Sequence, residues 1–117
     1  MLKKDSLNIL SRQVDQAWIL DISGEIDLYG SPQVRKNIEE ALSSKPRRLI
    51  INLIKVAYMD SSGLATLIEA FQHTKSKGIA FALFGVGPHL KSLFEITRLD
   101  TIFRIYSDEA EAMKGTS

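Results

Sequence analysis

The chain of 117 residues contains no cysteine and only two histidines, His73 and His89. Disulfide scaffolds, thiol nucleophiles and cysteine-based zinc sites all need cysteine, so the sequence excludes these three classes. Neither histidine belongs to a cluster of His, Asp and Glu at the spacing that metal ligands require. We therefore expect neither a metal site nor a cofactor. The missing cysteine also fits a reducing compartment.

An excess of charge and a long apolar run are also missing. Fifteen Lys and Arg face fourteen Asp and Glu, and this balance does not favour nucleic-acid binding. The longest apolar stretches have the length of a strand, whereas a membrane-spanning helix needs about 20 residues. Residues 1–5, MLKKD, provide no hydrophobic core of a signal peptide. We expect a cytoplasmic protein that binds neither nucleic acid nor a membrane.

No repeat and no Pro/Gly/Ser-rich linker divides the chain, so we expect one domain over residues 1–117, with an ordered part from about 6 to 114. Partial alternation of apolar residues predicts a hairpin, after which the Gly24-Glu25-Ile26-Asp27 segment is expected to leave the sheet. A nearly continuous apolar run indicates a buried central strand. In chain order, the expected strands are 6–14, 16–23, 49–53, 79–84 and 102–106.

Four helix starts lie between or after these strands. Ser31 is expected as an N-cap with Pro32 at the first helical position. The others are Asp60-Ser61-Ser62-Gly63, the turn at residues 85–88, and residues 107–109, whose helix should reach about Lys114. The order predicts an α/β fold with a mixed sheet of four or five strands and helices mainly on one face. The expected core residues are Leu20, Ile22, Ile51, Leu53, Leu67, Ile68, Phe71, Leu83 and Leu93.

The most informative segment, residues 56–64, joins the central strand to the second helix. A helix N-terminus carries about half a positive charge, so open N–H groups there would stabilise a phosphate on Ser61. We expect Gly63 to keep the approach open for the active site of another protein. The simpler interpretation is that one of these residues only caps the helix. A cap needs one such residue, however, and Asp60, Ser61 and Ser62 are all present.

Asp27 follows a strand end of the same type, so we expect it at the same edge as Ser61; the alternative is a solvated turn acid. Catalytic motifs fit poorly. The hydrolase elbow Gly-x-Ser-x-Gly would need glycine in place of Met59. The turn at residues 85–88 lacks the third glycine of a dinucleotide fingerprint and the Lys-Ser/Thr of a P-loop. We expect no enzyme.

These motifs together resemble the STAS domain family, named for sulfate transporters and anti-sigma factor antagonists. Asp60-Ser61-Ser62-Gly63-Leu64 resembles its most specific block, and Gly24-Glu25-Ile26-Asp27 resembles its Gly-Glu-hydrophobic-Asp motif. Residues 87–99 resemble a third segment, although Gly87 and Arg98 stand where the family often has Ser and Gly. The resemblance covers nearly the whole chain and implies a STAS-like fold.

The resemblance also implies a function. Anti-sigma factor antagonists bind an anti-sigma factor that is itself a serine kinase, and binding releases the sigma factor. The kinase then phosphorylates the serine after the motif aspartate, here Ser61, and a serine phosphatase resets the protein. Partner contacts are implied at Asp27, Asp60, Ser62 and Gly63, with Ser62 expected to supply a structural hydroxyl at the helix start. The alternative is a STAS scaffold without this cycle, in a stressosome or beside a transporter.

Overall fold

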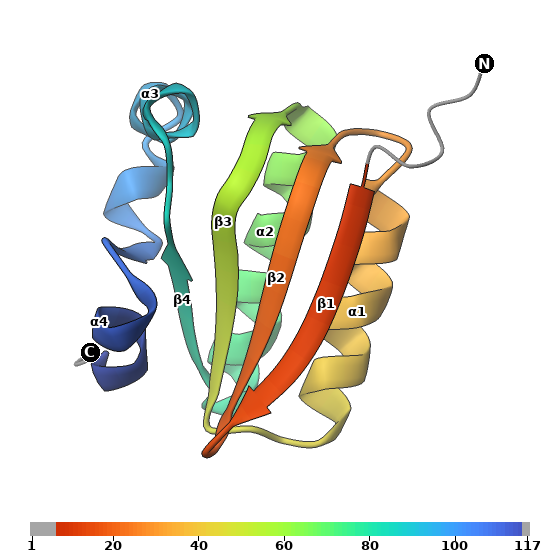
Figure 1. Ribbon diagram of the computed structural model, residues 1–117, viewed down its shortest axis with the longest axis vertical. Coiled ribbons are helices and arrows are strands. Elements are labelled where there is room, and N and C mark those ends of the chain that lie inside the picture. Colours follow the sequence, from red (N-terminus) through yellow and green to blue (C-terminus); the bar gives the residue numbers. More distant parts are fainter. Residues whose placement is uncertain (1–6, 116–117) are drawn as a thin grey trace.

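The computed structural model describes residues 7–115, which form one five-stranded sheet with four α-helices (Figure 1). Ser6, expected to begin the first strand, lies outside the described residues. The strands follow chain order across the sheet; only the first pair is antiparallel. They are β1 (Leu7–Val14), β2 (Ala17–Ile26), β3 (Arg48–Met59), β4 (Ala80–Phe84) and β5 (Arg104–Tyr106). The expected mixed sheet is confirmed.

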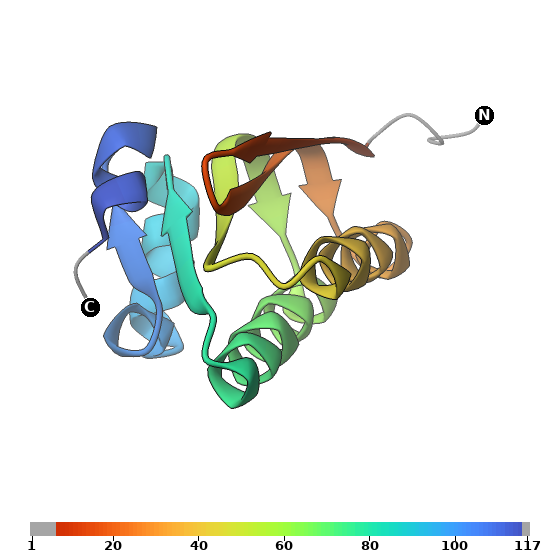
Figure 2. The same ribbon diagram turned by 90° about the horizontal axis from the view of Figure 1, so that it is seen from below.

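The helices lie mainly on one face, as the sequence predicts. They are α1 (Ser31–Ser43), α2 (Ser61–Lys77), α3 (Pro88–Ile96) and α4 (Glu109–Lys114), with a short 3₁₀ turn at Leu99–Thr101. Figure 2 shows α1 and α2 side by side on one face and α4 on the other. Within residues 7–115, no helix has both the length and the apolar character needed to span a bilayer.

The larger core lies between the sheet and α1, α2 and α3. Six of the nine expected core residues are buried there: Leu20, Ile22, Ile51, Leu53, Leu67 and Leu83. Ile68, Phe71 and Leu93 are only partly buried and pack against the rim of this core. The buried stripe of α2 consists largely of small side chains, which place the helix close to the sheet and leave the larger ones at its flanks.

Several predicted boundaries were wrong. The central strand, expected at residues 49–53, runs from Arg48 to Met59. The Gly24-Glu25-Ile26 segment stays in β2, where Gly24 has a φ of 114° next to a shift in register with β3. A bulge thus bends the strand without ending it. Helix α1 has Gly30 at its N-cap, and Ser31 is its first residue. The Ser31 hydroxyl donates to the Asp27 carbonyl oxygen at 2.6 Å and does not cap the helix.

Candidate functional site

Two connections meet where β2 and β3 end. Ile26 and Met59 are partners in the parallel register, and the Asp60 N–H donates to the Ile26 carbonyl oxygen at 3.3 Å. The Leu28 N–H donates to Asp60 Oδ2 at 3.2 Å. The loop of residues 27–30 and the start of α2 at residues 60–63 therefore form one continuous surface, which we call the Ser61 edge. Asp27 and Ser61 share this edge, as expected from the sequence.

The carboxylate of Asp60 connects both parts of the Ser61 edge. Asp60 is the N-cap of α2, with extended backbone angles. Its Oδ1 accepts from the Ser62 N–H at 2.9 Å and the Gly63 N–H at 3.2 Å, while Oδ2 holds the loop at Leu28. Two N–H groups that we expected to be open to a phosphate are therefore already occupied by a carboxylate.

Ser61 is the first residue of α2 and is exposed. Because Asp60 provides the cap, the Ser61 hydroxyl is not needed to start the helix. A phosphate on Ser61 would meet a cap that already holds a negative charge, so it gains less from the helix N-terminus than an open first turn would offer. The group would therefore project from the Ser61 edge toward solvent or a docked partner.

Ser62 and Gly63 have other roles than those expected. Ser62 is half-buried, and its carbonyl oxygen accepts from the Thr66 hydroxyl at 3.0 Å; the structural hydroxyl expected of it is replaced by the Asp60 cap. Gly63 is buried against the sheet and does not open a path for a partner. A Cβ at this position would lie 2.4 Å from the Ile26 carbonyl oxygen and 2.5 Å from Met59 Cγ.

Asp27 is half-buried and organises the loop that follows it, so it is not a solvated turn acid. Its Oδ1 accepts from the Tyr29 N–H at 3.0 Å and the Gly30 N–H at 2.9 Å. Its carbonyl oxygen accepts from the Ser31 N–H at 2.8 Å. Among residues 7–115 only Oδ1 of this carboxylate accepts hydrogen bonds, so Oδ2 is left for water or a partner.

Exposed apolar side chains lie at the Ser61 edge, and they are not among the residues predicted from the sequence. Leu28 is 64% exposed and Tyr29 is 88% exposed, both in the loop that Asp60 holds. Tyr58, which is 43% exposed, precedes the α2 start by three residues. The signal was available: an apolar Leu-Tyr pair between Asp27 and Gly30 lies in a turn, where neither strand nor helix periodicity explains it.

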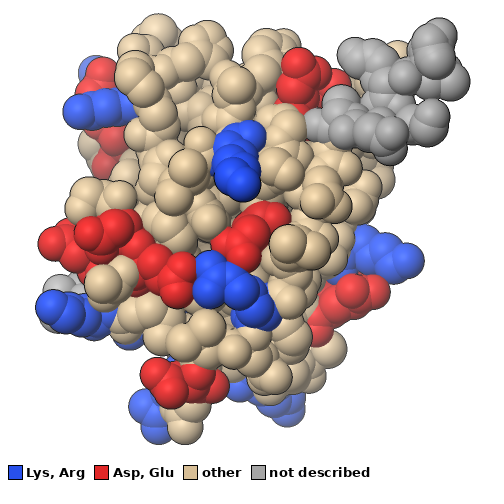
Figure 3. Space-filling view, in the orientation of Figure 1, with Lys and Arg blue, Asp and Glu red and all other residues tan. Residues whose placement is uncertain are grey.

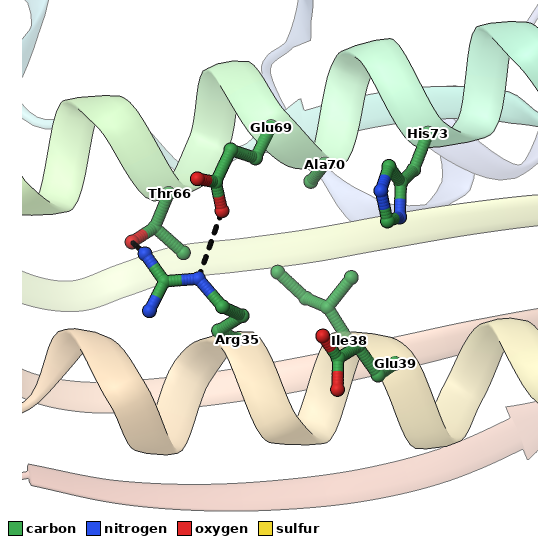
Figure 4. A pocket seen from close by; sticks show the side chains of 7 residues that line it. All are labelled: Arg35, Ile38, Glu39, Thr66, Glu69, Ala70 and His73. Carbon is green, nitrogen blue, oxygen red and sulfur yellow. Dashed lines mark hydrogen bonds and ion pairs between the residues drawn. The ribbon is translucent and has the colours of Figure 1, made fainter.

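The groove between α1 and α2 holds a structural ion pair (Figure 4). Arg35 Nε lies 2.8 Å from Glu69 Oε1, and Arg35 also reaches the buried Thr66 hydroxyl at 3.5 Å. His73 and Glu39 line the same groove, in which the space open to water is only about 20 Å³. Within the described part of the chain, no cluster of His, Asp and Glu could hold a metal ion. The groove thus offers no room for a small-molecule substrate.

Comparison with known proteins agrees with this geometry. The STAS domain family matches residues 8–112. The anti-sigma-B factor antagonist of Listeria monocytogenes is 37% identical over 112 residues, covering 96% of each chain. A crystal structure of an anti-sigma factor antagonist from Mycobacterium paratuberculosis superposes with a TM-score of 0.87 at 25% identity, covering 97% of each chain.

A third comparison concerns the fold alone. The Bacillus cell fate determinant SpoIIAA, solved in its phosphorylated form, has a TM-score of 0.72 at 20% identity. The alignment covers 92% of this chain and 97% of that one. With a family match over most of its length and a curated relative above 30% identity, the chain belongs to the STAS domain family and, within it, to the anti-sigma factor antagonists.

Proposed function

We propose that the protein binds an anti-sigma factor through the Ser61 edge and thereby frees a sigma factor. We propose further that this partner is a serine kinase whose phosphorylation of Ser61 ends the binding, and that a serine phosphatase restores it. The observation that carries the proposal is an exposed serine at the same sheet edge as the exposed Leu28 and Tyr29, whose loop is bonded to Asp60. In this cycle the protein is a cytoplasmic regulator and catalyses no reaction itself.

The apolar side chains supply the docking contacts. Tyr29 and Leu28 are large and exposed, and tyrosine is enriched among the residues that dominate interface energies. Covering them removes apolar surface from water. Asp27 Oδ2, which is left open on the same loop, can accept a hydrogen bond from a partner's Arg or Lys. Affinity thus comes mainly from the loop, while the phosphorylation state of Ser61 determines whether the partner binds.

Phosphorylation acts on the same contact. A phosphoserine carries about −1.5 to −2 charges at neutral pH. Asp60 already occupies the N–H groups of Ser62 and Gly63, so the protein itself offers little compensation. A partner surface fitted to a neutral hydroxyl must then desolvate this charge, and like charges juxtaposed across an interface cost several kcal/mol. A tenfold loss of affinity needs only about 1.4 kcal/mol.

Calorimetric titration against the cognate anti-sigma factor tests the switch. We expect the phosphorylated protein to bind at least about tenfold more weakly than the unmodified one, and Ser61→Ala to bind irrespective of ATP. The melting temperature should change little, because the cap does not involve the Ser61 hydroxyl. Equal affinities of the phosphorylated and unmodified proteins would refute the switch.

The acceptor is identified separately by mass spectrometry after incubation with the kinase and ATP. We expect phosphate on Ser61, loss of labelling in Ser61→Ala, and continued labelling in Ser62→Ala, because Ser62 is the more enclosed of the two. Phosphate on Ser62 in the wild type would reverse this assignment. Binding without any labelling would instead favour the scaffold function.

A further inference from the structure

The two edges of the sheet differ in length and protection. At one edge, β5 has three residues and begins with the exposed Arg104. At the other, β1 has eight residues, and among residues 7–115 it pairs on one side only, with β2. A free edge exposes unpaired N–H and C=O groups and is a template for another strand. The short β5 is protected from this pairing, whereas β1 is long enough to support it.

Proline and a bulge, two of the usual protections of an edge strand, are missing from β1. The strand contains no proline, and its register with β2 is continuous, so no bulge turns it away. Its one charged residue, Arg12, is neutralised by two carboxylates: Nε lies 2.5 Å from Asp21 Oδ2 and Nη2 lies 2.6 Å from Glu109 Oε1. The edge therefore presents no free charge that would repel another strand.

The sheet face beside this edge is open and combines apolar with polar side chains. Leu10 is 62% exposed on β1, and Ile54 on β3 is 61% exposed. Both line an open hollow of about 400 Å³ over β1, β2 and β3. Figure 3, which views this face, shows uncharged surface interrupted by a positively charged side chain near the centre of its upper half and by charged side chains across its middle. An added strand would cover part of the apolar surface that Leu10 presents.

We propose that β1 pairs antiparallel with β1 of a second copy of this chain, joining two sheets into one of ten strands. We place the two-fold axis of this pairing at Leu10, the large exposed apolar residue of the strand. With Leu10 opposite Leu10 of the other copy, Asn8 lies opposite Arg12, so no like charges meet. The two-fold symmetry pairs the free edge of β1 in each copy with that of the other, as an isologous contact requires.

The axis of such a dimer stands normal to the sheet and reverses the direction of the strands. The Ser61 edges, at the carboxyl ends of β2 and β3, then point to opposite ends of the dimer. The pairing is centred on Leu10 and does not involve Ser61, so we expect it not to depend on the function proposed above. We therefore expect Ser61→Asp to dimerise as the wild type does.

Cysteine cross-linking provides the sharpest test, because the chain has no native cysteine. Leu10→Cys should form a covalent dimer under mild oxidation, since side chains directly opposite on antiparallel strands lie about 4.5–5.5 Å apart at Cβ. Ile96→Cys is the matched control, an 80% exposed residue on α3, far from β1 in the fold. It should cross-link only at the rate of random collision.

Sedimentation velocity measures the same dimerisation without a covalent cross-link. The wild type should shift toward twice the mass of one chain as concentration rises. Leu10→Lys brings two cations together at the axis and should weaken dimerisation at least about tenfold, while Ile96→Lys should leave it unchanged. Circular dichroism checks that both variants fold. If Leu10→Lys does not fold, the comparison of Leu10→Cys with Ile96→Cys tests the proposal.

Three results would each overturn the proposal. The first is a wild type that remains monomeric at every concentration reached. The second is a folded Leu10→Lys that dimerises as tightly as the wild type. The third is a Leu10→Cys that cross-links no faster than Ile96→Cys. A dimer that forms with unchanged Leu10 variants would place the contact on another surface.

Discussion

Asp27 shows how one carboxylate can shape a docking loop. Its Oδ1 accepts two backbone N–H groups, at Tyr29 and Gly30, so its loss leaves both without this partner. We expect Asp27→Ala to lower the free energy of unfolding by about 1 kcal/mol, whereas an exposed loop acid would cost no more than about half of that. Urea denaturation measures the difference.

Asp27→Asn separates the two roles of this residue. The amide oxygen can still accept at the Oδ1 position, so its stability should return close to that of the wild type. The charge offered to a partner is lost, so binding of the anti-sigma factor should remain weakened. If Asp27→Asn bound and was phosphorylated like the wild type, Asp27 would have a structural role only.

At Gly63 we expect an added methyl group, and not the loss of a side chain, to destabilise the protein. A Cβ would collide with the Ile26 carbonyl oxygen and with Met59. We expect Gly63→Ala to destabilise the protein by about 1–3 kcal/mol, the usual range for overpacking. Gly87→Ala is the control, since no atom lies within 4 Å of a Cβ there. Equal midpoints of chemical denaturation for the two variants would contradict this view of Gly63.

At the scale of elements, an ion-pair network connects α4 to the sheet. Arg12 on β1 contacts Asp21 on β2 and Glu109 at the start of α4, and Asn52 on β3 donates to Asp21 Oδ1 at 2.8 Å. The hydrogen bond from Arg12 lowers the pKa of Asp21 despite some opposing desolvation. The charged form is thus the one that the folded protein stabilises.

This network predicts a dependence of stability on pH. The contribution of Asp21 is complete above its unfolded pKa of about 3.9 and is lost as pH falls through its lower folded pKa. Asp21→Asn should therefore be about 1 kcal/mol less stable at neutral pH, with a shallower fall in stability below about pH 5. Asp15→Asn, in the exposed hairpin turn, is the control; urea unfolding across pH compares them.

A result in which Asp21→Asn and the wild type lose stability in parallel on acidification would contradict the linkage. The network itself could not be predicted from the sequence, because Arg12 and Glu109 are 97 positions apart. Short-range patterns did predict the elements it connects. Alternation predicted the hairpin, and Asp108 was correctly included in the segment that caps α4.

The site was predicted less completely than the elements, for a physical reason. Sequence order places Asp27 and Ser61 at one sheet edge, because neighbouring parallel strands end together. It does not say which way a small residue faces, so Gly63 was taken for an open approach although it packs on Ile26. Nor does it show whether the carboxylate of Asp60 or the hydroxyl of Ser61 or Ser62 accepts from the first-turn N–H groups.

At the scale of the whole molecule, exposed apolar residues occur in several places, and only those at the Ser61 edge should matter for the anti-sigma factor. We expect Tyr29→Ser to weaken binding at least about tenfold, the loss typical of a strong interface contact. Ile102→Ser, a 45% exposed position near β5, should bind like the wild type. Both should keep their melting temperatures. Equal losses in the two variants would move the docking surface away from this edge.

Both oxygens of the Asp60 carboxylate accept hydrogen bonds, and this arrangement also affects the entropy of association. A surface loop and a frayed helix end normally move independently, and a partner must pay to order each of them. Here one side chain holds Leu28 through Oδ2 and the first turn of α2 through Oδ1. The loop and the serine therefore move as one body before any partner arrives. When a partner contacts Tyr29, Ser61 is therefore already in position, and a single encounter aligns both residues with the partner.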